Sequence, residues 1–296
     1  MANKLPGYIA LSLTILFWSS AFIGIRIGLH GYTPVAMGFF RYLIASLVMV
    51  PIFLVLPNKK RPTLPELCLL LANGAIGIGL YNVMLNVAEQ HVIAAISGFV
   101  ISTVPVFATI IAVLFLGERL YRFGWMGMLI SIAGLIIIFV AKAGTHFELN
   151  HSVLDLCIAA LSAAVYITLQ KPLLKKFQPL EIASYAIWAG TLVTIGWASK
   201  AWHEIPHAPL DATLAVIYLG IFPGAVSYTG WSVTIKYMAV SQATAGLYAS
   251  PILTTLLGWV IINEMPTPLV LFGGLCALFG AWIIYWSALR ARKKKM

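Results

Sequence analysis

The chain has 296 residues, of which 61% are hydrophobic and 9% charged, with a formal net charge of +10. Soluble domains carry about 25% charged residues, so the composition excludes an ordinary soluble protein and predicts a polytopic membrane protein. The positive charge does not indicate nucleic-acid binding, because the lysines and arginines follow the loop asymmetry that orients membrane proteins.

Ten apolar stretches of about 20 residues follow one another along the chain, and each is long enough to span a bilayer core of about 30 Å. The connections between them are too short for a soluble domain. The predicted fold class is an all-α polytopic membrane protein with ten transmembrane helices. The predicted spans are approximately residues 7–28, 34–56, 66–87, 93–116, 122–141, 153–171, 179–199, 211–234, 240–262 and 268–288.

The distribution of basic residues predicts the orientation. With the N-terminus in the cytoplasm, fifteen lysines and arginines fall on the inner side and only Lys142 and Lys200 on the outer side. Cytoplasmic loops carry such an excess. Both termini are therefore predicted to be cytoplasmic.

Spans 4 and 9 share a proline in the middle of an apolar run that closes on a glutamate. Pro105 precedes Glu118 by thirteen positions, Pro251 precedes Glu264 by thirteen, and the two pairs lie 146 positions apart. Proline in a helix interior removes a hydrogen bond and costs about 3 kcal/mol. We expect Pro105 and Pro251 to kink their helices at mid-span and to act as hinges; a static kink that improves packing is the alternative.

The same offset of 146 positions relates other residues of the two halves. Each half, 1–145 and 146–296, holds five predicted spans, and because five is odd the second half enters the membrane from the opposite side. Such inverted repeats are typical of secondary transporters, with the substrate site between the halves near the midplane. The matches at this offset, or within one residue of it, are Gly74 with Gly220, Tyr81 with Tyr228, Gly127 with Gly273, Gly134 with Gly280, and Pro34 with Pro179.

Several motifs resemble the ten-helix, EamA-type branch of the drug/metabolite transporter superfamily. They are "LGERL" at 116–120, "GMLISIAGLII" at 127–137, "GGLCALFGAWII" at 273–284, "FFRYLIASL" at 39–47 and "YTGW" at 228–231. One departure is "INEM" at the end of span 9, where the fuller Gly-Glu-Arg is absent. The resemblance implies a bacterial inner-membrane carrier that exports or exchanges small metabolites such as amino acids or nucleosides.

The candidate substrate site consists of aromatic and polar side chains at membrane depth, where a hydroxyl or an indole N–H needs a partner. Aromatic walls with a few placed polar groups are typical of small-molecule sites. Helix packing is the alternative for each residue alone. The predicted substrate-binding residues are Trp18, Tyr81, Asn82, Ser102, Tyr166, Gln170, Tyr228, Trp231 and Tyr248.

Charged residues contribute little to this predicted site. Every carboxylate falls in a loop or near a helix end, and we interpret Glu118 and Glu264 as ion-pairing or helix-capping groups. Arg41, inside span 2, could bind a substrate carboxylate, although a structural role such as snorkelling is favoured. The six histidines all fall on the predicted outer side and the three cysteines within spans, so no metal and no cofactor is expected.

Small residues in spans 5 and 10, such as Gly127 and Gly273, permit close helix approach. We expect a scaffold contact or a dimer contact there, hence a monomer or a weak homodimer. The predicted function is a secondary transporter, not an enzyme, that moves a neutral or zwitterionic metabolite, most simply an apolar or aromatic amino acid, by alternating access. Alternatives are a carrier of an adenosine-type metabolite such as S-adenosylmethionine, an intramembrane enzyme, or a channel.

Overall fold

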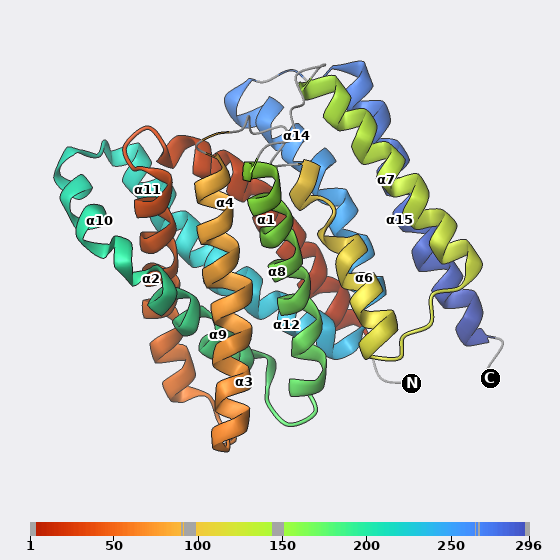
Figure 1. The fold of residues 1–296 in the computed structure, drawn as a ribbon, viewed down its shortest axis with the longest axis horizontal. Coiled ribbons are helices and arrows are strands. Elements are labelled where there is room, and N and C mark those ends of the chain that lie inside the picture. Colours follow the sequence, from red (N-terminus) through yellow and green to blue (C-terminus); the bar gives the residue numbers. More distant parts are fainter. Residues whose placement is uncertain are drawn as a thin grey trace.

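The computed structural model describes residues 4–89, 91, 99–143, 151–263, 265 and 267–293. Nine of the described helices are long and apolar enough to cross a membrane, and a shorter apolar helix covers Phe99–Phe115. Together they account for the ten predicted spans. The start of α1 and the end of α15 lie on the same side of the molecule (Figure 1).

The first half contains α1 (Leu5–Gly28), α2 (Pro34–Val55), α3 (Leu64–Gly74), η1 (Ala75–Leu80), α4 (Tyr81–Glu89), α6 (Val104–Phe115) and α7 (Arg122–Ala143). The second half begins with α8 (His151–Leu173), α9 (Pro179–Thr194), η2 (Ile195–Trp197), α10 (Ala198–Glu204) and η3 (Ile205–His207). It continues with α11 (Leu210–Leu219), η4 (Gly220–Val226), α12 (Ser227–Tyr237), α13 (Val240–Gly246), η5 (Leu247–Ala249), α14 (Ser250–Ile262) and α15 (Pro268–Lys293).

Helices α7 and α15 form an antiparallel pair along one edge of the molecule (Figure 1). A Cβ built on Gly127 would lie 2.5 Å from the Gly280 carbonyl oxygen, and one built on Gly134 would lie 2.5 Å from that of Gly273. Between these contacts, the Ser131 hydroxyl donates to the Ala277 carbonyl over 2.9 Å. Gly127 thus contacts Gly280, the counterpart of Gly134, and Gly134 contacts Gly273, the counterpart of Gly127. Such reciprocal contacts arise when the two halves are related by a two-fold rotation, as inverted repeats require.

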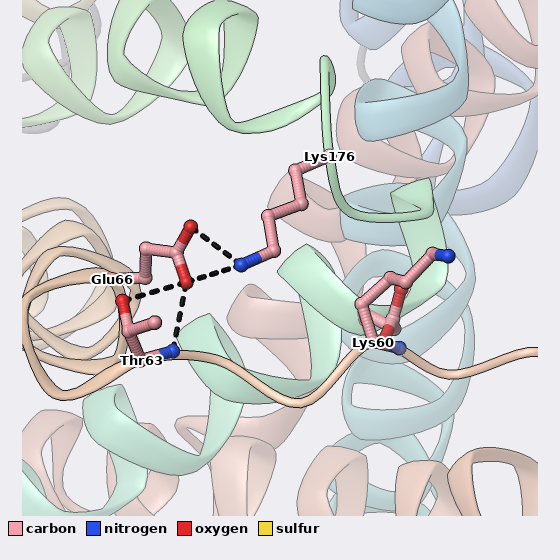
Figure 2. Close-up of polar contacts among 5 residues, drawn as sticks. Lys60, Thr63, Glu66 and Lys176 are labelled. Atoms are coloured by element: carbon pink, nitrogen blue, oxygen red, sulfur yellow. Dashed lines mark hydrogen bonds and ion pairs between the residues drawn. The ribbon is translucent and has the colours of Figure 1, made fainter.

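Two loops at the face that carries the start of α1 are joined by carboxylates. Figure 2 shows Glu66 between Thr63, whose N–H and hydroxyl both donate to it over 2.8 Å, and Lys176, whose Nζ lies 2.6 Å away. Buried Glu181 accepts the backbone N–H groups of Gln178 and Lys60 over 2.8 and 2.7 Å. Both carboxylates belong to capping boxes that begin α3 and α9, so the same groups start these helices and connect the two halves.

Spans 3 and 8 each contain a π-helical segment at the same place in the repeat. The N–H of Tyr81, at the end of η1, donates to the Ile76 carbonyl five residues back, and that of Ser227, at the end of η4, to the Phe222 carbonyl. Segment η1 packs against α8 and α9, whereas η4 packs against α1 and α2. Each π segment therefore contacts the first two spans of the opposite half. The sequence analysis did not predict this interruption of the helices.

Pro105 and Pro251 each lie beside an irregularity of their span, as expected, but neither lies in the interior of a regular α-helix. Span 4 is interrupted by a turn at Ser102 and Thr103, and Pro105 lies in the first turn of α6. Span 9 is interrupted by the 3₁₀ segment η5, and Pro251 lies in the first turn of α14. A proline in a first turn costs no intrahelical hydrogen bond, because the N–H it lacks has no partner there.

Candidate substrate site

An aromatic cluster centred on Tyr228 lies between the two halves. The Tyr228 ring contacts those of Trp18, Tyr42 and Tyr166 edge-on, at centroid distances of 5.7, 6.2 and 5.5 Å. Trp231 stacks on Trp18 at 5.6 Å. These side chains come from α1, α2, α8 and α12, so helices of both halves build the cluster.

Carbonyl groups of the two π segments bind polar atoms of this cluster. The Trp18 indole N–H donates to the Pro223 carbonyl of η4 over 3.2 Å. The Asn82 amide donates to the Ile78 carbonyl of η1 over 2.7 Å and to the Tyr42 hydroxyl over 2.8 Å. The Tyr42 hydroxyl in turn lies 3.2 Å from that of Tyr228. π segments occur frequently at functional sites, and here both of them adjoin the same cluster.

Glycines in the π segments allow the neighbouring helices to approach. A Cβ built on Gly77 of η1 would lie 2.0 Å from the Tyr166 Cβ, closer than real side chains allow. A Cβ on Gly220 of η4 would lie 2.9 Å from the Arg41 carbonyl oxygen. Larger residues at these positions would push α8 and α2, and with them Tyr166 and Tyr42, away from Tyr228.

Three buried polar atoms around Tyr228 have no hydrogen-bond partner among the described residues: Arg41 Nε, the Tyr166 hydroxyl and Trp231 Nε1. The Tyr166 hydroxyl lies near Gln170 and Ser232, which are bonded to each other over 2.6 Å. The guanidinium carbon of Arg41 is 5.4 Å from the Tyr42 ring centroid. Buried polar groups normally have partners, and each exception needs an explanation.

Two further carboxylates, Glu118 and Glu204, are engaged away from the cluster. Glu118 accepts the N–H groups of Val240 and Ser241 over 2.6 and 2.9 Å and the Ser241 hydroxyl over 2.6 Å, so it caps α13. Glu204 accepts the Thr33 N–H and hydroxyl, each over 2.8 Å, at the start of α2. The helix-capping interpretation of Glu118 is confirmed, whereas Glu264 lies outside the described residues.

The structure brings together six of the nine predicted site residues: Trp18, Asn82, Tyr166, Gln170, Tyr228 and Trp231. Tyr81, the first residue of α4, lies within electrostatic range of Arg41 at the edge of the cluster. Ser102 lies at the break before α6. Tyr248 lies in a separate hydrophobic cluster with residues of α7 and α15, namely Met128, Leu135, Ala277 and Ile284.

Sequence reasoning did not include Tyr42 and Ser232, which contact the predicted residues of the cluster. The signal that could have located the site is the pair of glycine-rich stretches "GAIGIGL" at 74–80 and "GIFPGAV" at 220–226, which become the π segments. The two stretches occupy the same position in each half, and the cluster lies beside them.

The cluster is tightly packed in this conformation. Trp231 is fully buried and Tyr166 only 2% exposed, so both side chains are surrounded by packed neighbours. An apolar groove of about 480 Å³ lies apart from the cluster, lined by α1 residues such as Ala10 and by Gly230 of α12.

This architecture, a membrane-embedded pair of inverted five-helix halves with a central aromatic cluster, is that of a membrane transporter. The model of the EamA-like transporter family matches the chain twice, at residues 5–140 and 152–286. The chain therefore belongs to the EamA-like transporter family.

Several bacterial proteins align with most of the chain. The uncharacterized transporter YdfC of Bacillus subtilis is 31% identical over 285 residues, covering 96% of this chain and 92% of YdfC. A protein of Streptantibioticus cattleyicolor described as a "probable terminal-alkyne amino-acid exporter" is 34% identical over 289 residues, covering 96% and 95% of the two chains. The uncharacterized inner membrane transporter YedA of Escherichia coli is 28% identical over 257 residues, covering 86% of this chain and 82% of YedA.

The fold is also found in a crystal structure that is 20% identical to this chain. It superposes with a TM-score of 0.81 and covers 98% of this chain and 99% of its own. At this identity the likeness concerns the fold alone.

Proposed function

We propose that this transporter moves an amino acid with an apolar or aromatic side chain across the bacterial inner membrane, as an exporter or exchanger that works by alternating access. In this proposal both termini are cytoplasmic, and the substrate binds among Trp18, Tyr42, Tyr166, Tyr228 and Trp231. The hinges that open the two faces in turn are the helix breaks before Pro105 and Pro251.

The observation that carries the proposal is the aromatic cluster at the junction of the halves, beside both π segments. Large aromatic surfaces accommodate an apolar side chain, while hydroxyl, amide and indole groups orient the polar end of a small molecule. The Streptantibioticus relative, named as an amino-acid exporter, supports the same substrate class. A nucleoside-type metabolite such as S-adenosylmethionine is the second candidate, because its base could stack between the two tryptophans.

The test is a thermal-shift series on the purified protein with amino acids, nucleosides and S-adenosylmethionine, followed by counterflow of the binder in proteoliposomes. A ligand that binds only the folded protein raises the melting temperature by mass action. We expect leucine, phenylalanine or a similar amino acid to give the largest shift. Stabilisation by nucleosides alone would replace the amino acid with the second candidate.

A variant pair ties binding to the cluster. Trp18→Ala removes one wall of the proposed site from a half-buried position, and should weaken binding by about 2 kcal/mol. Trp282→Ala, at a position that is 57% exposed on α15, is the matched control and should bind normally. Equal affinity in both variants would place the site elsewhere.

A further inference from the structure

We propose that Arg41 binds the carboxylate of the transported molecule, so that the transporter recognises carboxylic acids and does not require their amino group. This inference rests on the proposed function and refines its substrate class. It assigns a binding role to a residue that lies beside the aromatic cluster and whose buried Nε has no hydrogen-bond partner among the described residues.

The position of Arg41 is costly unless a ligand compensates for it. Its guanidinium is charged at all accessible pH values, and it is carried by α2 two turns after Pro34, about 10 Å along the helix from its start. A charge at such depth in a membrane is expensive and is normally paired. Among the described residues no carboxylate forms an ion pair with Arg41, and its buried Nε has no hydrogen-bond partner.

The surroundings of Arg41 fit an anion with two oxygen atoms. Tyr42 lies under the guanidinium, and Tyr228 and Tyr81 lie within its electrostatic range. The Tyr42 and Tyr228 hydroxyls, 3.2 Å apart, can donate to the same group. One planar guanidinium with adjacent hydroxyls matches a single carboxylate, whereas a phosphate would call for several cations, and no lysine is among the residues described at the cluster.

Among the described residues, no hydrogen bond or ion pair joins a carboxylate to the aromatic cluster. The four carboxylates described above cap helices or join loops, and the cluster itself offers only ring faces, hydroxyls and amides. Aromatic rings attract a cation more weakly than a carboxylate would. Recognition should therefore depend on the acid group of the substrate far more than on its amino group.

The role of Arg41 can be tested by comparing phenylalanine, phenyllactate and phenylalanine methyl ester as ligands in the thermal-shift assay. The hydroxy acid keeps the carboxylate and loses the ammonium, whereas the ester keeps the ammonium and loses the carboxylate. We expect phenylalanine and phenyllactate to stabilise the wild-type protein and the ester to have no effect. An ester that binds as well as the amino acid would overturn the proposal, even without any variant.

The variants are Arg41→Gln, Arg41→Lys and the control Arg61→Gln, which alters an exposed loop arginine. Losing a charge-assisted bidentate contact should weaken binding of phenylalanine roughly 10- to 100-fold. Lysine should restore part of the affinity, and Arg61→Gln should bind as the wild type does. The melting temperature of ligand-free Arg41→Gln should be unchanged or higher, because a charge within a span that has no ion-pair partner among the described residues has been removed.

The outcomes separate the two proposals. If no amino acid or hydroxy acid stabilises the wild-type protein, the proposed amino-acid function fails. If phenylalanine binds the wild type and Arg41→Gln equally, only the role of Arg41 fails. A ligand-free Arg41→Gln that melts well below the wild type, with the ligand-induced shift intact, would make Arg41 a structural residue.

Discussion

Glu118 shows how a short motif can connect the two halves of the molecule. Gly117 adopts a φ of +64° after the last turn of α6, a conformation that favours glycine. The Glu118 N–H then donates to the Ala112 carbonyl over 3.1 Å, so the backbone folds back onto the last turn of the helix. The side chain of Glu118 is thereby directed at the start of α13. At the corresponding position of the other half, Asn263 has a φ of 56°, so "INEM" retains the turn with the residue that best replaces glycine.

Glu118→Ala should lower the free energy of unfolding by about 1–2 kcal/mol, because the first turn of α13 loses its cap. The control is Lys176→Ala, which removes the exposed ion pair with Glu66 and should cost less than about 1 kcal/mol. Melting temperatures of the two purified variants decide the matter. Equal losses would mean that the Glu118 contacts contribute no more than a surface ion pair.

At the scale of single residues, most aromatic members of the cluster could be predicted because tyrosine and tryptophan at membrane depth are unusual. Asn82 and Gln170 followed from the same argument. The importance of Tyr42 could not be predicted, because it depends on Asn82 and Tyr228, which other helices bring to it. Tyr248 was predicted by the same argument, but it packs against the α7–α15 pair and not in the cluster. Only the packing of the helices reveals this difference.

The two π segments are the elements that distinguish this bundle from ten plain helices. Gly77→Ala should be strongly destabilising, because its Cβ would lie 2.0 Å from that of Tyr166; overpacking of this kind costs about 1–3 kcal/mol or more. Gly196→Ala is the control, since a Cβ there would meet no atom within 4 Å. The melting temperatures of the two variants should differ by several degrees, and similar values would show that α8 moves away from η1 without cost.

The breaks before Pro105 and Pro251 give a second prediction for these elements. Alanine at either position lets the helix extend toward the preceding turn, which should favour one access state and slow transport, while stability changes little. Pro179→Ala, at the start of α9, is the control because that helix begins at the loop and no break precedes it within a span. Transport rates in proteoliposomes that match the wild type in both variants would rule out a hinge.

The spans were predictable from hydropathy, but the interruptions within them were not. An apolar stretch satisfies the length criterion whether its backbone is α-helical, π-helical or broken. The prolines at 105 and 251 did indicate irregular backbone, yet their cost was assessed for a helix interior. Whether a proline lies in the interior or in a first turn depends on where the preceding helix stops, and tertiary packing decides that.

At the scale of the whole molecule, the repeat was predictable because matching glycines and prolines recur at a nearly constant offset. The structure explains why these positions match. Gly127 of α7 packs against Gly280 of α15, and Gly134 packs against Gly273, so all four positions need a small residue. The orientation in the membrane still rests on the positive charges of the loops.

A labelling experiment tests that orientation. In a background without Cys68, Cys157 and Cys276, Lys60→Cys should be shielded from an impermeant thiol reagent in intact cells, and Lys200→Cys should react. Both positions are exposed in the structure, so accessibility to the reagent reports on the side of the membrane. The reverse pattern would invert the assignment of every loop.

The charge at position 41 has no equivalent in the other half. Span 2 aligns with span 7 at an offset of 145 residues, from Pro34 to Pro179, so the counterpart of Arg41 is Ala186. In the proposed alternating-access cycle the two-fold frame opens toward either face, whereas the cationic group belongs to one half only. A bound acid would therefore keep a single polarity while the halves rock around it. In the proposed orientation Arg41 lies toward the outer end of span 2, so an exported acid would enter from the cytoplasm with its acid group leading and leave with that group first, without tumbling inside the protein.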